Sequence, residues 1–450
     1  MKTKIIFAAL ALAATTTLYA QVTIGLSADM AAIPFQFIQG VEVEYPDGTV
    51  VRYGPLMGAG LGRLDGTAGP RIRLDARAVS TGAGLRLRLQ AQGHASVGVE
   101  NFLQAWWSPL GWLRIDMGRF DDDRLRGRIG HDDMHSFTVL MQDQDAIFNR
   151  VRARGGLMFS LSPVEGLLFT ALLNNLSPLV LEGHNYDRPL GTEPGYRPQH
   201  HRPYFPTLSF VPWESRFGNG DMWRNVHVAA GYAIPGIGLV RVQYIGVIPG
   251  SPAIDPDAGE LDILPGAIVA PRVEAAFAFT GVEGLVLDLG GKAPLPVRES
   301  FPGITETWQS PFRASLGARY SIGDLEISGR VDTWFGGERN VSGENGGTLG
   351  TLSFAPIVNA HLWPSFGFGA SRVILNAGFE FIGETTRTVT ENTTVVGDGG
   401  IRFGLGLSMQ HGFPGGFRAR GGVAYRFPTE VNGIRERGVL TVPLFLEYSL

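Results

Sequence analysis

The chain has 450 residues and a formal charge of −4, because its 42 acidic residues outnumber its 38 Lys and Arg residues. This balance excludes a general binder of nucleic acids, which would carry a basic excess. The sequence has no cysteine, so disulfides, thiolate metal sites and cysteine catalysis are excluded too. With 62 glycines and only 18% charged residues, the chain is too apolar for a disordered protein and too rich in glycine for a helical one.

Residues 1–20 predict a secretory signal peptide. Lys2 and Lys4 give a basic start, residues 5–14 are apolar, and Ala20 offers a small residue for cleavage. A membrane anchor is the alternative, but a spanning helix needs about 20 apolar residues. We therefore expect removal of residues 1–20, and a single transmembrane domain over residues 21–450.

From residue 21 onward, the hydropathy alternates with a period of two. Every second residue is apolar in segments such as 71–77, 85–90, 113–117 and 401–410. This period predicts strands with one apolar and one polar face. A soluble sandwich would give the same local pattern. Three features favour a membrane barrel: Gly, Ser and Arg on the polar face, segments near the ten residues that a tilted strand needs to cross a bilayer, and the signal peptide.

The connections alternate between short turns and long polar segments. Short Gly- and Pro-containing turns lie at 108–111, 162–166, 234–238, 280–284, 321–324 and 411–416. Long polar segments lie at 119–154, 175–221, 292–311, 335–351 and 385–399. This layout predicts an all-β fold: an antiparallel up-and-down transmembrane β-barrel of about 16–18 strands, with short periplasmic turns and long extracellular loops. The strand number stays open because residues 50–107 divide in two ways.

If the apolar face meets lipid, the opposite face lines a lumen. The predicted lumen cations are Arg71, Arg73, Arg77, Arg86, Arg88, Arg114, Arg241, Arg330, Arg372, Arg402, Arg418 and Arg420. The predicted lumen anions are Asp75, Asp116, Asp288, Glu326, Asp332, Glu380 and Glu447. An excess of Arg favours anions in a pore. The alternative is that each Arg simply pairs with an acid on a neighbouring strand, and the sequence does not decide between the two.

Two of the long polar segments suggest specific functional sites. Segment 175–221 is rich in Pro and aromatic residues, so it is a candidate constriction of the lumen, with an outward surface loop as the alternative. Segment 119–154 holds Asp121–Asp123 and His131–Asp133. These residues could form a metal site or an Asp/His protease site, but we favour a solvated charged loop. Loose helical spacing predicts a short helix over 133–152. We find no catalytic motif, and we expect no enzyme activity, no metal and no cofactor.

Tryptophans lie close to predicted short turns. Trp106, Trp107 and Trp112 flank one turn, and Trp363 lies near another. They fit an aromatic girdle at the membrane interface. Packing in a protein core is the alternative.

The alternation, the rhythm of turns and the terminal strand at 441–450 resemble those of bacterial outer-membrane porins. Porins usually end in an aromatic residue, whereas this chain ends in Leu450 with Tyr448 on the apolar phase. A narrower resemblance, to spirochaetal (Treponema-type) outer-membrane barrels, is carried by Gly66–Leu74, Ala105–Trp112 and Gly118–Asp121. The porin resemblance implies an outer-membrane location in contact with lipid, insertion by the barrel assembly machinery, and a homotrimer.

These observations predict a porin that passes small hydrophilic solutes through an Arg-lined lumen with a weak anion preference. Two alternatives remain open. One is a closed structural or adhesive barrel that acts through its surface loops, and the other is an outer-membrane hydrolase. No nucleic-acid partner is expected.

Overall fold

The computed structural model describes most of the chain after residue 20, and the residues it describes lie almost entirely in antiparallel strands. The described residues are 21–39, 41–44, 48–62, 71–92, 96–122, 124–125, 151–173, 226–246, 272–301, 304–309, 311–343, 345–353, 355–389, 392–397, 399–431 and 434–449. The predicted signal peptide, residues 1–20, lies outside them. No helix within the described ranges is long and apolar enough to cross a membrane.

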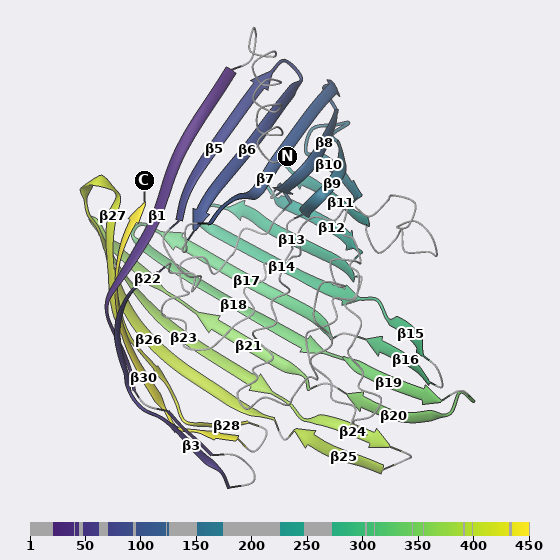
Figure 1. The fold of residues 1–450 in the computed structure, drawn as a ribbon, viewed down its shortest axis with the longest axis vertical. Coiled ribbons are helices and arrows are strands. Elements are labelled where there is room, and N and C mark those ends of the chain that lie inside the picture. Colours follow the sequence, from purple (N-terminus) through teal and green to yellow (C-terminus); the bar gives the residue numbers. More distant parts are fainter. Residues whose placement is uncertain are drawn as a thin grey trace.

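Nineteen strands of the described chain follow one another around a single wall (Figure 1). They are β1 (Gln21–Ile38), β5 (Arg71–Ser80), β6 (Ala83–Gln92), β7 (Ser96–Leu110), β8 (Leu113–Asp122), β9 (Val151–Leu161), β10 (Leu167–Leu173), β11 (Val226–Ile234), β12 (Gly238–Ile245), β13 (Arg272–Val282), β14 (Leu285–Pro294), β17 (Phe312–Ile322), β18 (Leu325–Phe335), β21 (Ile357–Leu362), β22 (Ser365–Phe368), β23 (Ser371–Ile382), β26 (Gly400–Gly412), β27 (Phe417–Arg426) and β30 (Val439–Ser449). β21 and β22 share one place between β18 and β23. Within the described residues the wall therefore has eighteen places, in agreement with the predicted 16–18 strands.

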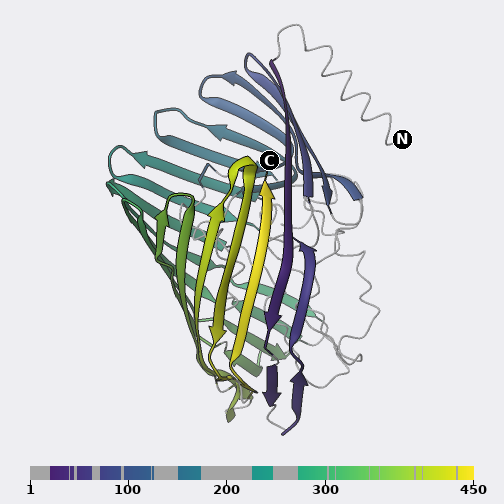
Figure 2. The same ribbon diagram turned by 90° about the vertical axis from the view of Figure 1, so that its left-hand side faces the viewer.

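The first strand closes the wall on itself. Residues 21–29 of β1 pair with β5, and residues 29–38 pair with β30, so the pairings return to their starting point. In Figure 2 the purple β1 runs beside the yellow β30. β4 (Leu56–Gly62) pairs with the later part of β1 and continues the line of β5. Residues 50–62, where the sequence left the strand division open, therefore add no further place to the wall.

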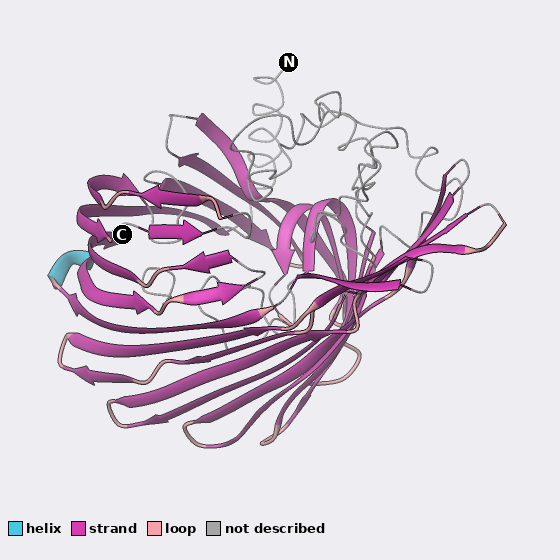
Figure 3. Cartoon of the chain, turned by 90° about the horizontal axis from the view of Figure 1, so that it is seen from below, coloured by secondary structure: helices cyan, strands magenta, loops and turns pink. Residues whose placement is uncertain are grey.

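The two ends of the barrel differ in their connections. At one end, tight turns join neighbouring strands, and they lie along one rim in the view from below in Figure 3. The turn between β26 and β27 holds the short 3-10 helix η5 (Pro414–Gly416). The tight turns at 81–82 and 283–284 place Gly82 and Gly284 in the left-handed region, where other residues are strained.

At the other end, several long connections are hairpins rather than irregular loops. A six-stranded sheet is made of β15 (Val297–Phe301), β16 (Ile304–Gln309), β19 (Glu338–Gly343), β20 (Thr348–Ser353), β24 (Thr385–Val389) and β25 (Asn392–Gly397). A second group is made of β2 (Val41–Glu44), β3 (Val50–Tyr53), β28 (Thr429–Val431) and β29 (Ile434–Glu436). The prediction of long polar loops at 292–311, 335–351 and 385–399 therefore needs correction. Their Thr, Val and Ile residues favour strands, and each hairpin pairs with its neighbours.

The barrel is inverted relative to a soluble protein, with an apolar exposed face and a polar buried face. On β12, Val240 and Val242 are 44% and 47% exposed, whereas Arg241 and Gln243 are 1% and 2% exposed. β26 repeats the pattern, with its Leu residues exposed and Ser408 buried. An exposed apolar band of this extent is stable only in contact with lipid. The fold is therefore a membrane-spanning β-barrel with a polar interior.

Two of the four tryptophans predicted to form an interfacial girdle lie on the apolar face, and two do not. Trp107 and Trp112 are exposed on the apolar face, as an interfacial girdle requires. Trp106 and Trp363 are buried on the inner face, and Trp363 packs against Ile374. The reason is the period of two, because adjacent residues of a strand point to opposite faces.

Candidate functional site: the polar inner face

The inner face of β5 and β6 carries one carboxylate between two arginines. Asp75 accepts hydrogen bonds from Arg86 at 3.0 and 2.7 Å and from Arg88 at 3.0 and 2.7 Å. The strands are direct neighbours, with Asp75 opposite Arg88 and Arg77 opposite Arg86. Arginines therefore lie on neighbouring strands of this face, and an acid lies between them.

The same arrangement recurs on β17 and β18. Asp332 binds the guanidinium groups of Arg313 at 3.1 Å and Arg330 at 2.7 Å, and the hydroxyl of Ser315 also donates to it. The Arg313 guanidinium lies over the ring of Trp334, 4.7 Å from its centroid. All of the charged groups are nearly fully buried.

Two further carboxylates are shared by two cations each. Glu274 on β13 accepts a 2.6 Å hydrogen bond from Arg272 and lies 3.9 Å from the Lys292 ammonium. Glu326 on β18 lies 3.3 Å from Arg372 and 4.0 Å from Arg319. In each group one negative charge faces two positive charges.

Glu274 also belongs to a buried network that crosses three strands. Gln243 on β12 donates to Glu274 at 2.5 Å, and its carbonyl oxygen lies 2.8 Å from Nε2 of His227 on β11. Buried polar groups need such partners, because an unpaired one costs about 1–3 kcal/mol.

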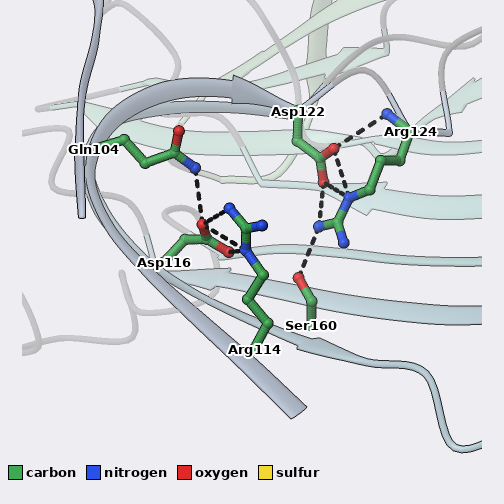
Figure 4. Close-up of polar contacts among 6 residues, drawn as sticks. All are labelled: Gln104, Arg114, Asp116, Asp122, Arg124 and Ser160. Carbon is green, nitrogen blue, oxygen red and sulfur yellow. Dashed lines mark hydrogen bonds and ion pairs between the residues drawn. The ribbon is translucent and has the colours of Figure 1, made fainter. Parts of the chain in front are cut away.

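Two carboxylates on β8 bind arginine side chains on the inner face (Figure 4). Arg114 and Gln104 both donate to the fully buried Asp116, at distances of 2.6–3.0 and 2.8 Å. Beyond the strand, Arg124 binds Asp122 at 2.7 Å and Ser160 of β9 at 2.8 Å. Burial acts to lower the pKa of Arg124, but the hydrogen bond and charge of Asp122 outweigh it, so this pKa is raised above its ordinary value.

Leu125 then contacts the wall several strands away. It packs against Ala229 on β11 and Ala276 on β13, and its carbonyl oxygen accepts a hydrogen bond from Arg241 on β12. Arg241 also forms a buried ion pair with Asp288 on β14. Residues 124–125 are therefore held at the inner face of β10–β13.

The inner face divides into a buried arc and a solvent-exposed arc. Asp116, Glu274, Asp288 and Ser328, on β8 and β13–β18, have no exposed area. By contrast, Arg86 on β6 and Arg372 and Arg402 on β23 and β26 keep about a third of their side-chain area exposed, at 29%, 31% and 33%. Water therefore reaches the inner wall mainly along the arc that runs from β23 through β1 to β6.

The remaining predicted residues lie on the same face where their side chains are described. Arg402 binds Glu380 at 2.9 Å, and Arg420 donates to Gln410 at 3.3 Å. Arg73 and Arg418 lie on β5 and β27, in phase with Asp75 and Arg420. For Arg71 and Glu447 the structure gives only their strand positions, opposite Gln92 and Arg418.

Sequence reasoning missed several charged residues of the inner face. They are Arg272, Glu274, Lys292, Arg313 and Arg319. Lys292 falls in the predicted polar segment 292–311, but it lies on the phase of Asp288 within β14. Extending each alternating segment by one or two residue pairs would have found most of the set.

The hypotheses on two long segments fall outside the described residues. Residues 174–225 contain the candidate constriction, and residues 126–150 contain His131–Asp133 and most of the predicted 133–152 helix. Val151 and Arg152 already belong to β9, so that helix cannot extend to them. Within the described ranges no group of His, Asp and Glu side chains is arranged to hold a metal ion.

Comparison with known proteins gives structural likeness without sequence kinship. No family model matches the chain, and no curated protein matches it. Among solved structures, the anion-selective porin from Comamonas acidovorans aligns over 96% of this chain and 100% of its own, with a TM-score of 0.42 and 11% identity. The outer membrane channel DcaP of Acinetobacter baumannii aligns over 96% of this chain and 98% of its own, with a TM-score of 0.44 and 10% identity. OmpT, an outer membrane protein of Vibrio cholerae, aligns over 95% and 98%, with a TM-score of 0.38 and 9% identity.

Proposed function

We propose that the protein is an outer-membrane porin that passes small hydrophilic solutes through an Arg-lined lumen with a weak anion preference. The wall supports this proposal, because barrels of 16–18 strands enclose an aqueous channel. The inverted faces support it as well, because a polar interior needs water or polar partners.

The sharing of one carboxylate by two cations carries the anion preference. It occurs at Asp75, Glu274, Glu326 and Asp332. Cross-strand pairing and an anion-selective lumen were alternatives at the level of the sequence. In each of these four groups, two cations lie within ion-pairing distance of one carboxylate. Positive rings of this kind favour anions in a pore.

The exposed arc gives the proposed solute path. Asp75 with its two arginines, Arg372 on β23, and the Arg402 pair all lie along it. A path between these groups meets more guanidinium than carboxylate groups. Because they are partly hydrated, the surrounding salt screens their field and keeps the selectivity weak.

The remaining parts of the proposal concern location and assembly. We propose that the mature barrel, without residues 1–20, contacts outer-membrane lipid, that the barrel assembly machinery inserts it, and that it forms a homotrimer. We propose no catalytic function and no cofactor. Chemical cross-linking in native membranes tests the trimer, and a monomer alone would remove that part.

Single-channel recording of the refolded protein in a planar bilayer, under a salt gradient, tests the function. We expect discrete conductance steps and a reversal potential that favours anions. Steps without selectivity would remove the charge argument and keep the channel. Inserted, folded protein that gives no steps would indicate the closed structural barrel instead.

A further inference from the structure

The inner face of β5–β8 holds an arginine, Arg77, that makes no ion pair with a carboxylate among the described residues. Arg77 is exposed and lies directly opposite Arg86. Among the described residues its contact is with the ring of Trp106, where its guanidinium carbon lies 5.3 Å from the ring centroid. Like charges directly opposite each other across two strands repel, so this position favours an anion.

Trp106 also contacts a second arginine. The guanidinium carbon of Arg114 lies 5.0 Å from the same ring centroid. Four guanidinium groups (Arg77, Arg86, Arg88 and Arg114), from β5, β6 and β8, thus lie near each other on the inner face, and the described carboxylates that bind them are Asp75 and Asp116. Within this group, four positive charges face two negative charges.

The N–H groups of Arg77 are available to a ligand. Among the described residues no hydrogen bond uses the N–H groups along the planar edge of its guanidinium. That planar edge matches two oxygens carried by one atom, as in a carboxylate or a phosphate.

A glycine fixes the position of the ring. Gly84 on β6 lies directly opposite Trp106, and a Cβ added at Gly84 would come within 2.0 Å of a ring carbon. The indole can therefore lie over β6 and reach Arg77 on β5 only while residue 84 has no side chain. Strand positions three pairs from the β5–β6 turn place the whole arrangement near the short-turn end of the barrel.

We propose that Arg77, Arg86, Arg114 and Trp106 form a binding subsite for small oxyanions that present two oxygens on one atom. The subsite rests on the proposed function, because it names an anion class for the same lumen. Arg77 supplies charge and N–H donors, Arg86 adds positive charge, Trp106 contacts Arg77 and Arg114, and Asp116 holds Arg114 in place.

Calorimetric titration of the refolded protein in detergent tests the subsite, with sodium acetate and sodium phosphate at constant ionic strength. Arg77→Lys keeps the charge but loses the planar fork and the stacking, so we expect it to weaken binding about fivefold. Gly84→Ala should weaken binding similarly by displacing the ring. Arg435→Lys is the control, because Arg435 is exposed and paired with Glu430 on the hairpins outside the wall, and it should leave binding unchanged.

The outcomes separate the ligand sources and the two proposals. The subsite is supported if acetate, phosphate or both bind saturably and if Arg77→Lys weakens this binding while the control Lys variant does not. The anion that binds identifies the ligand. Absence of saturable binding, or an equal effect of Arg435→Lys, overturns it. If Gly84→Ala does not fold, Arg77→Lys still decides. Channel steps without saturable binding remove only the subsite, whereas binding without channel steps removes only the proposed channel.

Discussion

At the scale of residues, the interior is organised by sharing rather than by one-to-one pairing. A buried carboxylate held by two cations is well satisfied, but removing it leaves both cations without a counter-charge. A buried ion pair is therefore more costly to break than it is stabilising to form, with a penalty of about 3–5 kcal/mol for removing one partner. The inner face should accordingly be sensitive to loss of its acids.

Asp288→Asn should lower the stability of the barrel, because Arg241 is fully buried and loses its carboxylate partner. We expect a fall of about 3 kcal/mol in the free energy of unfolding, measured as a lower midpoint of urea unfolding in detergent. Glu430→Gln breaks the exposed pair with Arg435 and should leave the midpoint unchanged. Equal midpoints for both variants would contradict the buried pair.

The double change of Arg73 and Arg88 to Gln should reduce the anion preference, because both lie on the exposed arc of the inner face. We expect the reversal potential under a salt gradient to move toward zero. Arg52→Gln, which removes an exposed charge on β3 outside the wall, is the control and should have no effect. An unchanged reversal potential in the double variant would argue against an arginine-lined path.

At the scale of elements, apolar and polar residues alternate along each strand of the wall, because one face meets lipid and the other faces the interior. This alternation is why the sequence predicts the strands well. The phase of Arg241 or Asp332 follows from their apolar neighbours alone. The hairpins at the long-connection end were missed because their alternation is polar on both faces and short. The contact of Leu125 with β11 and β13 was beyond reach, because it depends on where the chain turns after β8 and not on any local pattern.

Deleting residues 338–353 should remove β19 and β20 from the middle of the six-stranded sheet. The hairpins β15–β16 and β24–β25 then lose their partners, and isolated two-stranded hairpins are marginally stable. We expect rapid proteolysis at both, detected by mass spectrometry, with an intact barrel. Deleting the end hairpin 297–309 instead should leave β24–β25 protected. Equal protection in both variants would show that the sheet pairings contribute little.

An Arg on the apolar face should test the membrane orientation of a strand. Leu289 lies in the middle of β14, and Ile322 lies beside a tight turn, both exposed. Leu289→Arg should cost about 2–4 kcal/mol in lipid, and Ile322→Arg about 0–1 kcal/mol, because the penalty falls toward the interface. Folding titrations in lipid vesicles measure both. Equal costs would place these positions at the same depth.

At the scale of the whole molecule, the sequence predicts the architecture but not the state of the lumen. Strand number, connection rhythm and the direction of each face follow from repeating local patterns. The division into a buried and an exposed arc does not, because it depends on which parts of the wall face each other across the interior. For the same reason, the sequence does not distinguish cross-strand ion pairing from an excess of positive charge in the lumen. Both depend on which residues face each other across neighbouring strands.

The staggered pairing of β1 makes the barrel depend on both ends of its sequence at once. The first strand of the wall finds one partner early, in β5, but its other half needs β30, which follows the other described strands of the wall in chain order. Until then the growing sheet carries two open edges, which invite pairing with other chains. Contacts this distant in sequence also form slowly. A chain that ends before β30 therefore cannot close the barrel. Pairing of β1 with β30 occurs only after every other strand of the wall has been made.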